Sequence, residues 1–132
     1  MNKELNPREI NTTALAFLGD AVYEIYIRKY VMETGEMRAD RLHRLAVRYV
    51  CAEGQAKAVR KLVKDFLTEE ESEVVRKARN RKSVSKSRSA DAITYKMATA
   101  FEALLGYLYL DGRTERIDAV LAEAVRIIEE RE

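Results

Sequence analysis

Two apolar stretches, each carrying a single acid, decide how this chain folds. Residues 14–22 read Ala-Leu-Ala-Phe-Leu-Gly-Asp-Ala-Val, and residues 97–110 read Met-Ala-Thr-Ala-Phe-Glu-Ala-Leu-Leu-Gly-Tyr-Leu-Tyr-Leu. Asp20 and Glu102 are the only charged residues in these stretches. Burying an ionised carboxylate without a partner costs on the order of several kcal/mol. Each acid therefore needs either a cation or a route to solvent.

A glycine accompanies each acid inside a predicted helix. Gly19 precedes Asp20, and Gly106 lies one turn after Glu102. Glycine costs roughly 1 kcal/mol relative to alanine in a helix, which a close approach of two helix backbones could offset. Helices that cross there would bring the two carboxylates face to face, so that a proton or a hard cation such as Mg²⁺ must relieve their repulsion. The structural alternative is an ion pair with Arg48 or Lys96.

Helical spacing of apolar residues continues outward from both stretches and predicts one all-α domain over residues 1–132. The first helix should begin at a Thr12 or Thr13 cap and end near Thr34-Gly35. A second helical region should run from about residue 39 to about residue 67, with a break around Glu53-Gly54.

Three further helices follow from capping signals. Thr68 and Glu71 have the spacing of a capping box, which predicts a helix start there. Asp91 should cap the helix that carries Glu102 and runs to about residue 110. Asp111-Gly112 should end that helix, and Thr114 should begin the last one.

Composition excludes several classes of protein. No apolar run approaches the roughly 20 residues that a membrane helix needs. The N-terminus lacks the basic-then-apolar pattern of a secretion signal, and a single cysteine, Cys51, cannot form an internal disulfide. A cytoplasmic location is therefore expected. One histidine, His43, argues against a zinc site or a histidine-based nucleophilic triad.

Positive charge is concentrated in one segment. Residues 76–96 contain eight basic residues and one acid, a net charge of +7 that leaves −5 on the rest of the chain. Residues 80–90 are basic and rich in serine, with almost no large apolar side chain, and are expected to form a mobile loop. Such a strip fits a polyanion such as nucleic acid, although a solvated basic loop would have the same composition.

The two acid-bearing motifs resemble those of the ribonuclease III family. Leu-Ala-Phe-Leu-Gly-Asp-Ala-Val at residues 15–22 is similar to the family's signature helix, and Phe-Glu-Ala-Leu-Leu-Gly at residues 101–106 is similar to its second metal-binding helix. Tyr23-Glu24 and the basic stretch after Arg79-Asn80 resemble the Mini-ribonuclease III branch of the family. The resemblance covers essentially the whole chain. The family's usual four acids align with Ala16, Asp20, Thr99 and Glu102, so that two of the four are missing.

This resemblance implies a ribonuclease III endonuclease-domain-like helical bundle that forms a homodimer. It implies an endoribonuclease that uses Mg²⁺, with Mn²⁺ as a substitute, to cut double-stranded RNA and leave 5′-phosphate ends. The expected substrate is precursor 23S (large-subunit) ribosomal RNA, a ribosomal protein is a possible partner, and no membrane is involved. Asp20 and Glu102 are the expected catalytic and metal-binding residues. The expected RNA-binding residues are Arg79, Arg81, Lys82, Lys86 and Arg88.

Two other functions fit the sequence less well. One is a non-catalytic helical RNA-binding or ribosome-associated protein, in which the missing acids mark a dead nuclease. The other is a helical dimer whose basic loop contacts another protein. For the dimer interface, apolar positions around Phe17 and Tyr107 are the expected candidates.

Overall fold

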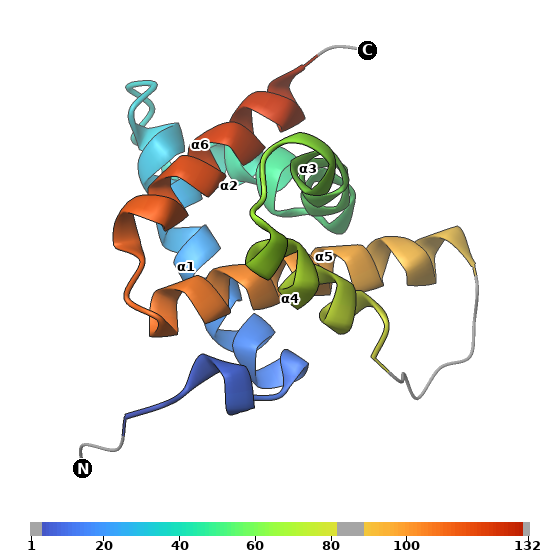
Figure 1. Cartoon of the computed structure of the whole chain (residues 1–132). Helices are drawn as coiled ribbons and strands as arrows, with labels where there is room; N and C mark the ends of the chain where they lie inside the picture. Colours follow the sequence, from blue (N-terminus) through green and yellow to red (C-terminus); the bar gives the residue numbers. More distant parts are fainter. Residues whose placement is uncertain (1–3, 82–88, 131–132) are drawn as a thin grey trace.

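A computed structural model describes residues 4–81 and 89–130, and over these ranges the chain is helical and contains no strand (Figure 1). The all-α fold predicted from the sequence is thus confirmed. In chain order the elements are the 3₁₀ turn η1 (Pro7–Glu9), α1 (Thr12–Met32), α2 (Ala39–Val50), α3 (Ala52–Asp65), α4 (Glu69–Arg79), α5 (Ala90–Leu110) and α6 (Thr114–Glu129).

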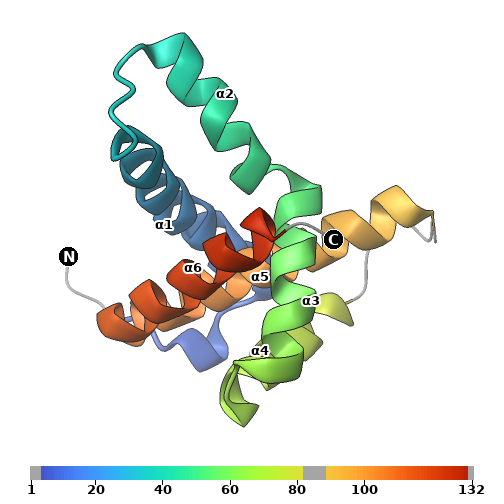
Figure 2. The same cartoon turned by 90° about the horizontal axis from the view of Figure 1, so that it is seen from above.

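Helix α5 forms the centre of the bundle. It contacts α1, α3, α4 and α6, and these helices surround most of its length (Figures 1 and 2). Phe101, Leu104, Leu105 and Leu108 are fully buried along it. Fully burying one such side chain contributes roughly 1.5–3 kcal/mol. The apolar run around Glu102 therefore supplies the core of the domain as well as one of its two lone acids.

The crossing of α1 and α5 is a direct contact between two helix backbones. A Cβ atom added to Gly19 would overlap the carbonyl oxygen of Glu102, and one added to Gly106 would overlap the carbonyl oxygen of Leu15. The close approach predicted from the two glycines is confirmed. It fixes the register of α1 against α5, and with it the neighbours of Asp20.

Two predicted helix caps are wrong by one to two residues. Asn11, rather than Thr12 or Thr13, caps α1, with its side chain accepting from the backbone N–H of Ala14. Ser89, rather than Asp91, caps α5 by accepting from the N–H of Ala92. Each helix start offers more than one short polar residue within three positions, and the backbone geometry selects the one whose side-chain oxygen reaches the third N–H of the helix.

The break in the second helical region comes earlier than the sequence suggested. Cys51 lies in extended conformation between α2 and α3, and its Sγ accepts from the N–H of Gly54. Gly54 lies inside α3, where an added Cβ would come within 2.6 Å of the Arg48 carbonyl oxygen. The glycine thus permits close packing of α3 on the end of α2. In Figure 2 the turn between α1 and α2 projects away from the other helices.

The capping box at the start of α4 is confirmed and is tied into the core. Thr68 accepts from the N–H of Glu71, and the Glu71 carboxylate accepts from the N–H of Thr68. Glu71 is fully buried and also pairs with Arg116 of α6 at 2.7 Å. This ion pair locks the beginning of α4 to the beginning of α6. None of the helices in the described ranges is long and apolar enough to cross a membrane.

Replacing Gly19 with alanine should severely destabilise the protein. The new methyl group has no space unless α1 and α5 move apart, because the obstructing atoms are backbone. We expect the free energy of unfolding to fall by about 3 kcal/mol or more, at or beyond the upper end of ordinary overpacking. Urea unfolding would measure it, with Ala119→Ser on the exposed face of α6 as a control expected to change stability by less than about 0.5 kcal/mol. A G19A protein of wild-type stability would contradict the crossing described here.

Candidate functional site

The two lone acids meet at the α1–α5 crossing. Asp20 follows the glycine whose Cα lies against the backbone of Glu102, and the two carboxyl groups are close enough to share a hydrogen bond. The Asp20 side chain is exposed, whereas that of Glu102 is half-buried. The site is therefore a carboxylate pair that is sheltered by protein on one side and open to solvent on the other.

Burial and the second carboxylate make Glu102 hard to ionise. Desolvation, followed by the hydrogen bond and the charge of Asp20, raises the pKa of Glu102 to about 8. The side-chain amide of Gln55 opposes this by donating a hydrogen bond, while the charge of Glu24 adds to it. At neutral pH the pair therefore holds a proton unless a cation takes its place.

Neither acid has the ion-pair partner that a purely structural role would require. Within residues 4–81 and 89–130, no basic side chain forms an ion pair with Asp20 or Glu102. Arg48, one of the two partners considered from the sequence, instead donates to the carbonyl oxygen of Ile128. The carboxylate pair is thus left with excess negative charge and no compensating cation from the described chain.

Gln55, in the first turn of α3, is a neighbour of the acids that the sequence analysis missed. Its Nε2 donates to the carbonyl oxygen of Val50 at 2.9 Å, and its side chain is 4% exposed. Its Oε1 has no hydrogen-bond partner. A sequence signal did exist, because Gln55 is a polar residue one turn before Val59 and two turns before Leu62 on the same buried stripe.

These residues fit a hard divalent cation. The described residues contain no group of three or more His, Cys, Asp or Glu side chains that could hold a metal. Mg²⁺ does not require such a group, since it binds proteins through one or two carboxylates and keeps its remaining positions for water and phosphate oxygens. Two neighbouring carboxylates without a basic partner, together with a glutamine side chain that contacts one of them, have the donor chemistry for such an ion.

A third carboxylate, Glu24, lies one turn beyond Asp20 on α1. It pairs with Arg28 at 3.0 Å across one turn of the helix. Its charge still contributes to raising the pKa of Glu102. Glu24 thus adds negative potential to the site while its own carboxylate is engaged elsewhere.

The structure places only part of the predicted RNA-binding set. Arg79 is exposed at the end of α4 and Arg81 follows it. Lys82, Lys86, Arg88 and most of the predicted loop lie outside the described residues. A groove between α3 and α4 adds basic residues that the sequence analysis did not single out. Its basic lining residues are Arg60, Lys64, Arg76 and Arg79.

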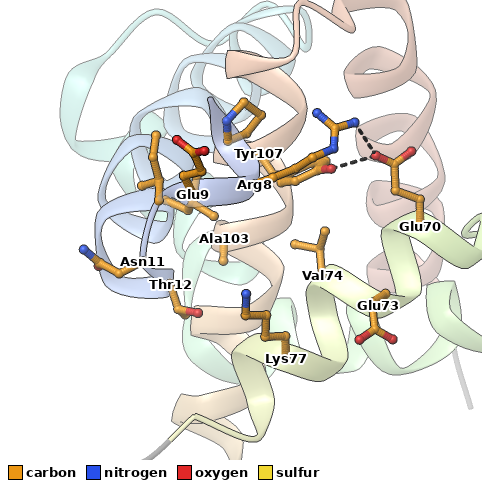
Figure 3. A pocket seen from close by; sticks show the side chains of 13 residues that line it. Arg8, Glu9, Asn11, Thr12, Glu70, Glu73, Val74, Lys77, Ala103 and Tyr107 are labelled. Carbon is orange, nitrogen blue, oxygen red and sulfur yellow. Dashed lines mark hydrogen bonds and ion pairs between the residues drawn. The ribbon is translucent and has the colours of Figure 1, made fainter. Parts of the chain in front are cut away.

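A separate pocket of about 400 Å³ lies between the N-terminal segment, α4 and α5 (Figure 3). Three of its polar side chains are paired with one another, since Glu70 accepts hydrogen bonds from Tyr107 at 2.6 Å and from Arg8 at 3.0 Å (Figure 3). It contains neither Asp20 nor Glu102.

Tyr107 is 5% exposed. The expectation that Tyr107 lies at a dimer interface is therefore wrong, because its hydroxyl and ring are used within the domain.

Comparison with known proteins identifies the class of domain that this fold and site define. The ribonuclease III domain matches residues 13–113, which include both acids and both crossing glycines. A crystal structure of a protein from Fusobacterium nucleatum superimposes with a TM-score of 0.76 and 33% identity, covering 90% of this chain and 94% of that one.

Curated relatives are similar over nearly their full length. A Mini-ribonuclease 3 from Symbiobacterium thermophilum is 46% identical over 94% of this chain and 95% of its own. One from Brevibacillus brevis is 46% identical over 98% of each chain. The chain therefore belongs to the ribonuclease III family, in its Mini-ribonuclease III branch, and is an endoribonuclease. The non-catalytic alternatives considered from the sequence are set aside on this ground.

The raised pKa of Glu102 predicts how metal-free stability depends on pH. Between its unfolded value near 4.5 and its folded value of about 8, the native state holds a proton that the unfolded state releases. Stability should therefore fall as pH rises through this window. Urea unfolding in EDTA should show Glu102→Gln to be stabilising relative to wild type, and more so at pH 8.5 than at pH 5.5. Because Glu102 is partly solvated, solvent screening will reduce the difference below the value the shift alone would give. A pH-independent difference would contradict the assignment.

Proposed function

We propose that this protein is a divalent-metal-dependent endoribonuclease that cuts double-stranded RNA, with Asp20 and Glu102 as its catalytic, metal-binding residues. The observation that carries the proposal is the carboxylate pair at the α1–α5 crossing, which lacks a basic partner among the described residues. Mg²⁺ is the physiological ion, with Mn²⁺ as a substitute. Precursor 23S ribosomal RNA in the cytoplasm is the substrate, and a ribosomal protein is a candidate partner.

The chain's own residues prepare the site for the ion and the phosphate. Asp20 and Glu102 would hold the cation through their carboxylate oxygens, which requires Glu102 to be ionised. A bound divalent ion lowers the pKa of a water and neutralises negative charge that develops on the phosphodiester. The close backbone packing holds both carboxylates on rigid helices, and this fixes their separation before RNA arrives.

Basic residues of the segment 79–88 hold the duplex through its phosphates. Double-stranded RNA is recognised mainly by shape, phosphates and 2′-hydroxyls rather than by base sequence. Arg79 ends α4 and Arg81 follows it, and Lys82, Lys86 and Arg88 continue the same positive segment in the sequence. These five residues form the RNA-binding strip of the proposal.

The exposed face of α1 fits a homodimer. Leu15, Gly19 and Tyr23 face the core, yet the opposite side of the helix is also apolar, with Phe17 84% and Ile25 72% exposed. An exposed apolar stripe of this kind marks an interaction surface. A groove between α1 and α6, lined by Leu18, Val22 and Leu121 among others, adjoins it. A two-fold axis on this face would relate two active sites, as paired cuts on opposite RNA strands require.

Asp20→Asn and Glu102→Gln should each abolish cleavage while the fold survives. Each change keeps the side-chain shape and removes one of the two charges that hold the cation, so turnover should fall by at least about 100-fold, equivalent to about 2.7 kcal/mol of barrier. Cleavage of a duplex RNA would be followed with Mg²⁺, with Mn²⁺ and in EDTA. Near wild-type turnover in either variant, or undiminished cleavage in EDTA, would disprove the assignment.

Neutralising Lys82, Lys86 and Arg88 to glutamine should weaken RNA binding without affecting folding. In a plot of log affinity against log salt concentration, each lost phosphate contact should reduce the slope by up to about 1, because one fewer counterion is released from the RNA on binding. Fluorescence anisotropy with labelled duplex RNA, in EDTA at several salt concentrations, would measure the slope. Arg126→Gln on α6 provides a control for charge removal outside the strip. An unchanged slope in the triple variant would mean that another surface holds the RNA.

Phe17→Asp should shift the protein from dimer toward monomer. The charge would be placed on the exposed apolar face of α1, where a second copy would have to desolvate it. Sedimentation velocity at micromolar concentration would show the change, with Val63→Asp on exposed α3 surface as the control. A wild-type protein that sediments as a monomer would refute the dimer.

A further inference from the structure

Gln55 is the only glutamine in the chain, and its buried side chain forms a hydrogen bond with Glu102 of the acid pair. Among the described residues, Glu71 and Thr99 are the other buried residues with a polar or charged side chain. The other two have partners, because Glu71 binds Arg116 and the Thr99 hydroxyl donates to the carbonyl oxygen of Tyr95. Gln55 alone of the three keeps a buried oxygen, Oε1, without a hydrogen bond.

The orientation of the Gln55 amide is fixed by its nitrogen. Nε2 donates to the carbonyl oxygen of Val50 at 2.9 Å, and a carbonyl at that position cannot face the amide oxygen. The same amide also donates toward the Glu102 carboxyl group. The side chain therefore bridges the junction of α2 and α3 to the acid on α5.

The backbone that carries Gln55 is held in place. Cys51 caps α3, and Gly54 packs so closely on the last turn of α2 that a side chain there would meet the Arg48 carbonyl oxygen. The side chains of α3 that follow, Ala56, Val59 and Leu62, are fully buried. The amide is thus presented to the site by a rigid element rather than by a loop.

A buried amide oxygen without a donor requires an explanation. Hard divalent cations accept amide carbonyl oxygens together with carboxylates, either directly or through a bound water. A neutral oxygen adds a donor without adding to the repulsion between Asp20 and Glu102. This matters because Asp20 and Glu102 have no third Asp, Glu, His or Cys beside them that would complete a metal-binding group among the described residues.

We propose that Gln55 is the third protein donor of the cation site, with Oε1 contacting the divalent ion or one of its waters while Nε2 orients Glu102. The inference rests on the proposed function, since it assumes that Asp20 and Glu102 bind the ion. It adds to the cation site a residue from the first turn of α3, which lies outside both acid-bearing stretches.

The test is Mn²⁺ binding by the RNA-free protein, read from the electron paramagnetic resonance signal of free Mn²⁺. Gln55→Met keeps length and bulk but removes both polar atoms, and should weaken binding by about 10-fold or more, as removal of a supporting group in a metal site does. Gln55→Glu keeps an oxygen and adds negative charge, and should bind Mn²⁺ at least as tightly as wild type. Melting temperatures in EDTA would report folding separately.

The comparison between the two variants decides the matter. Gln55→Met with wild-type affinity would overturn the inference. Equal weakening in Gln55→Met and Gln55→Glu would also overturn it, because the residue would then only brace the α2–α3 junction through Nε2. If Gln55→Met fails to fold, the Mn²⁺ affinity of Gln55→Glu still tests the inference, because a weaker affinity than that of the wild type would contradict the proposed role of Oε1.

A control variant and a reference variant separate this inference from the proposed function. Glu71→Gln disturbs another buried polar group and should lower the melting temperature without changing Mn²⁺ affinity. Glu102→Gln should abolish Mn²⁺ binding. A wild-type protein that binds no Mn²⁺, or that binds it equally after Glu102→Gln, would refute the metal site itself rather than the part played by Gln55.

Discussion

At the crossing of α1 and α5, the backbone of each helix occupies the space in which a side chain of the other would lie. Gly19 and Gly106 make this possible, and the core helices pack around the resulting contact. Because the obstructing atoms are carbonyl groups, the crossing cannot be adjusted by choosing another rotamer. The same constraint brings Asp20 to Glu102, so that the feature that orders the bundle also assembles the acid pair.

The acid pair destabilises the folded state of the metal-free protein. Desolvation and mutual repulsion raise the pKa of Glu102 to about 8, and no basic side chain among the described residues relieves this. Glu71 shows the contrasting solution, since its buried carboxylate is satisfied by Arg116 and a helix N-terminus. This contrast between a fully paired glutamate and an uncompensated one supports the proposal that Glu102 binds an external cation.

The surface of the domain has distinct areas beyond this pair. The outer face of α1 is apolar, and the groove between α3 and α4 is lined by four basic residues together with the acids Glu69 and Glu73. At the pocket of Figure 3, Glu70 pairs with Arg8 and Tyr107, and these contacts hold the N-terminal segment against α4 and α5.

The sequence by itself determined the helical class, the approximate helix boundaries and the identity of the two acids, because apolar periodicity, helical glycines and lone charges are local signals with direct physical costs. It misplaced two caps, where neighbouring polar residues compete and only backbone geometry selects Asn11 and Ser89. Only the tertiary structure decided what surrounds the acids. It buried Tyr107 within the domain and brought Gln55 to Glu102 from a distant helix. Periodicity predicts which side of a helix is buried, but which residue of another helix lies opposite depends on how all of the helices pack.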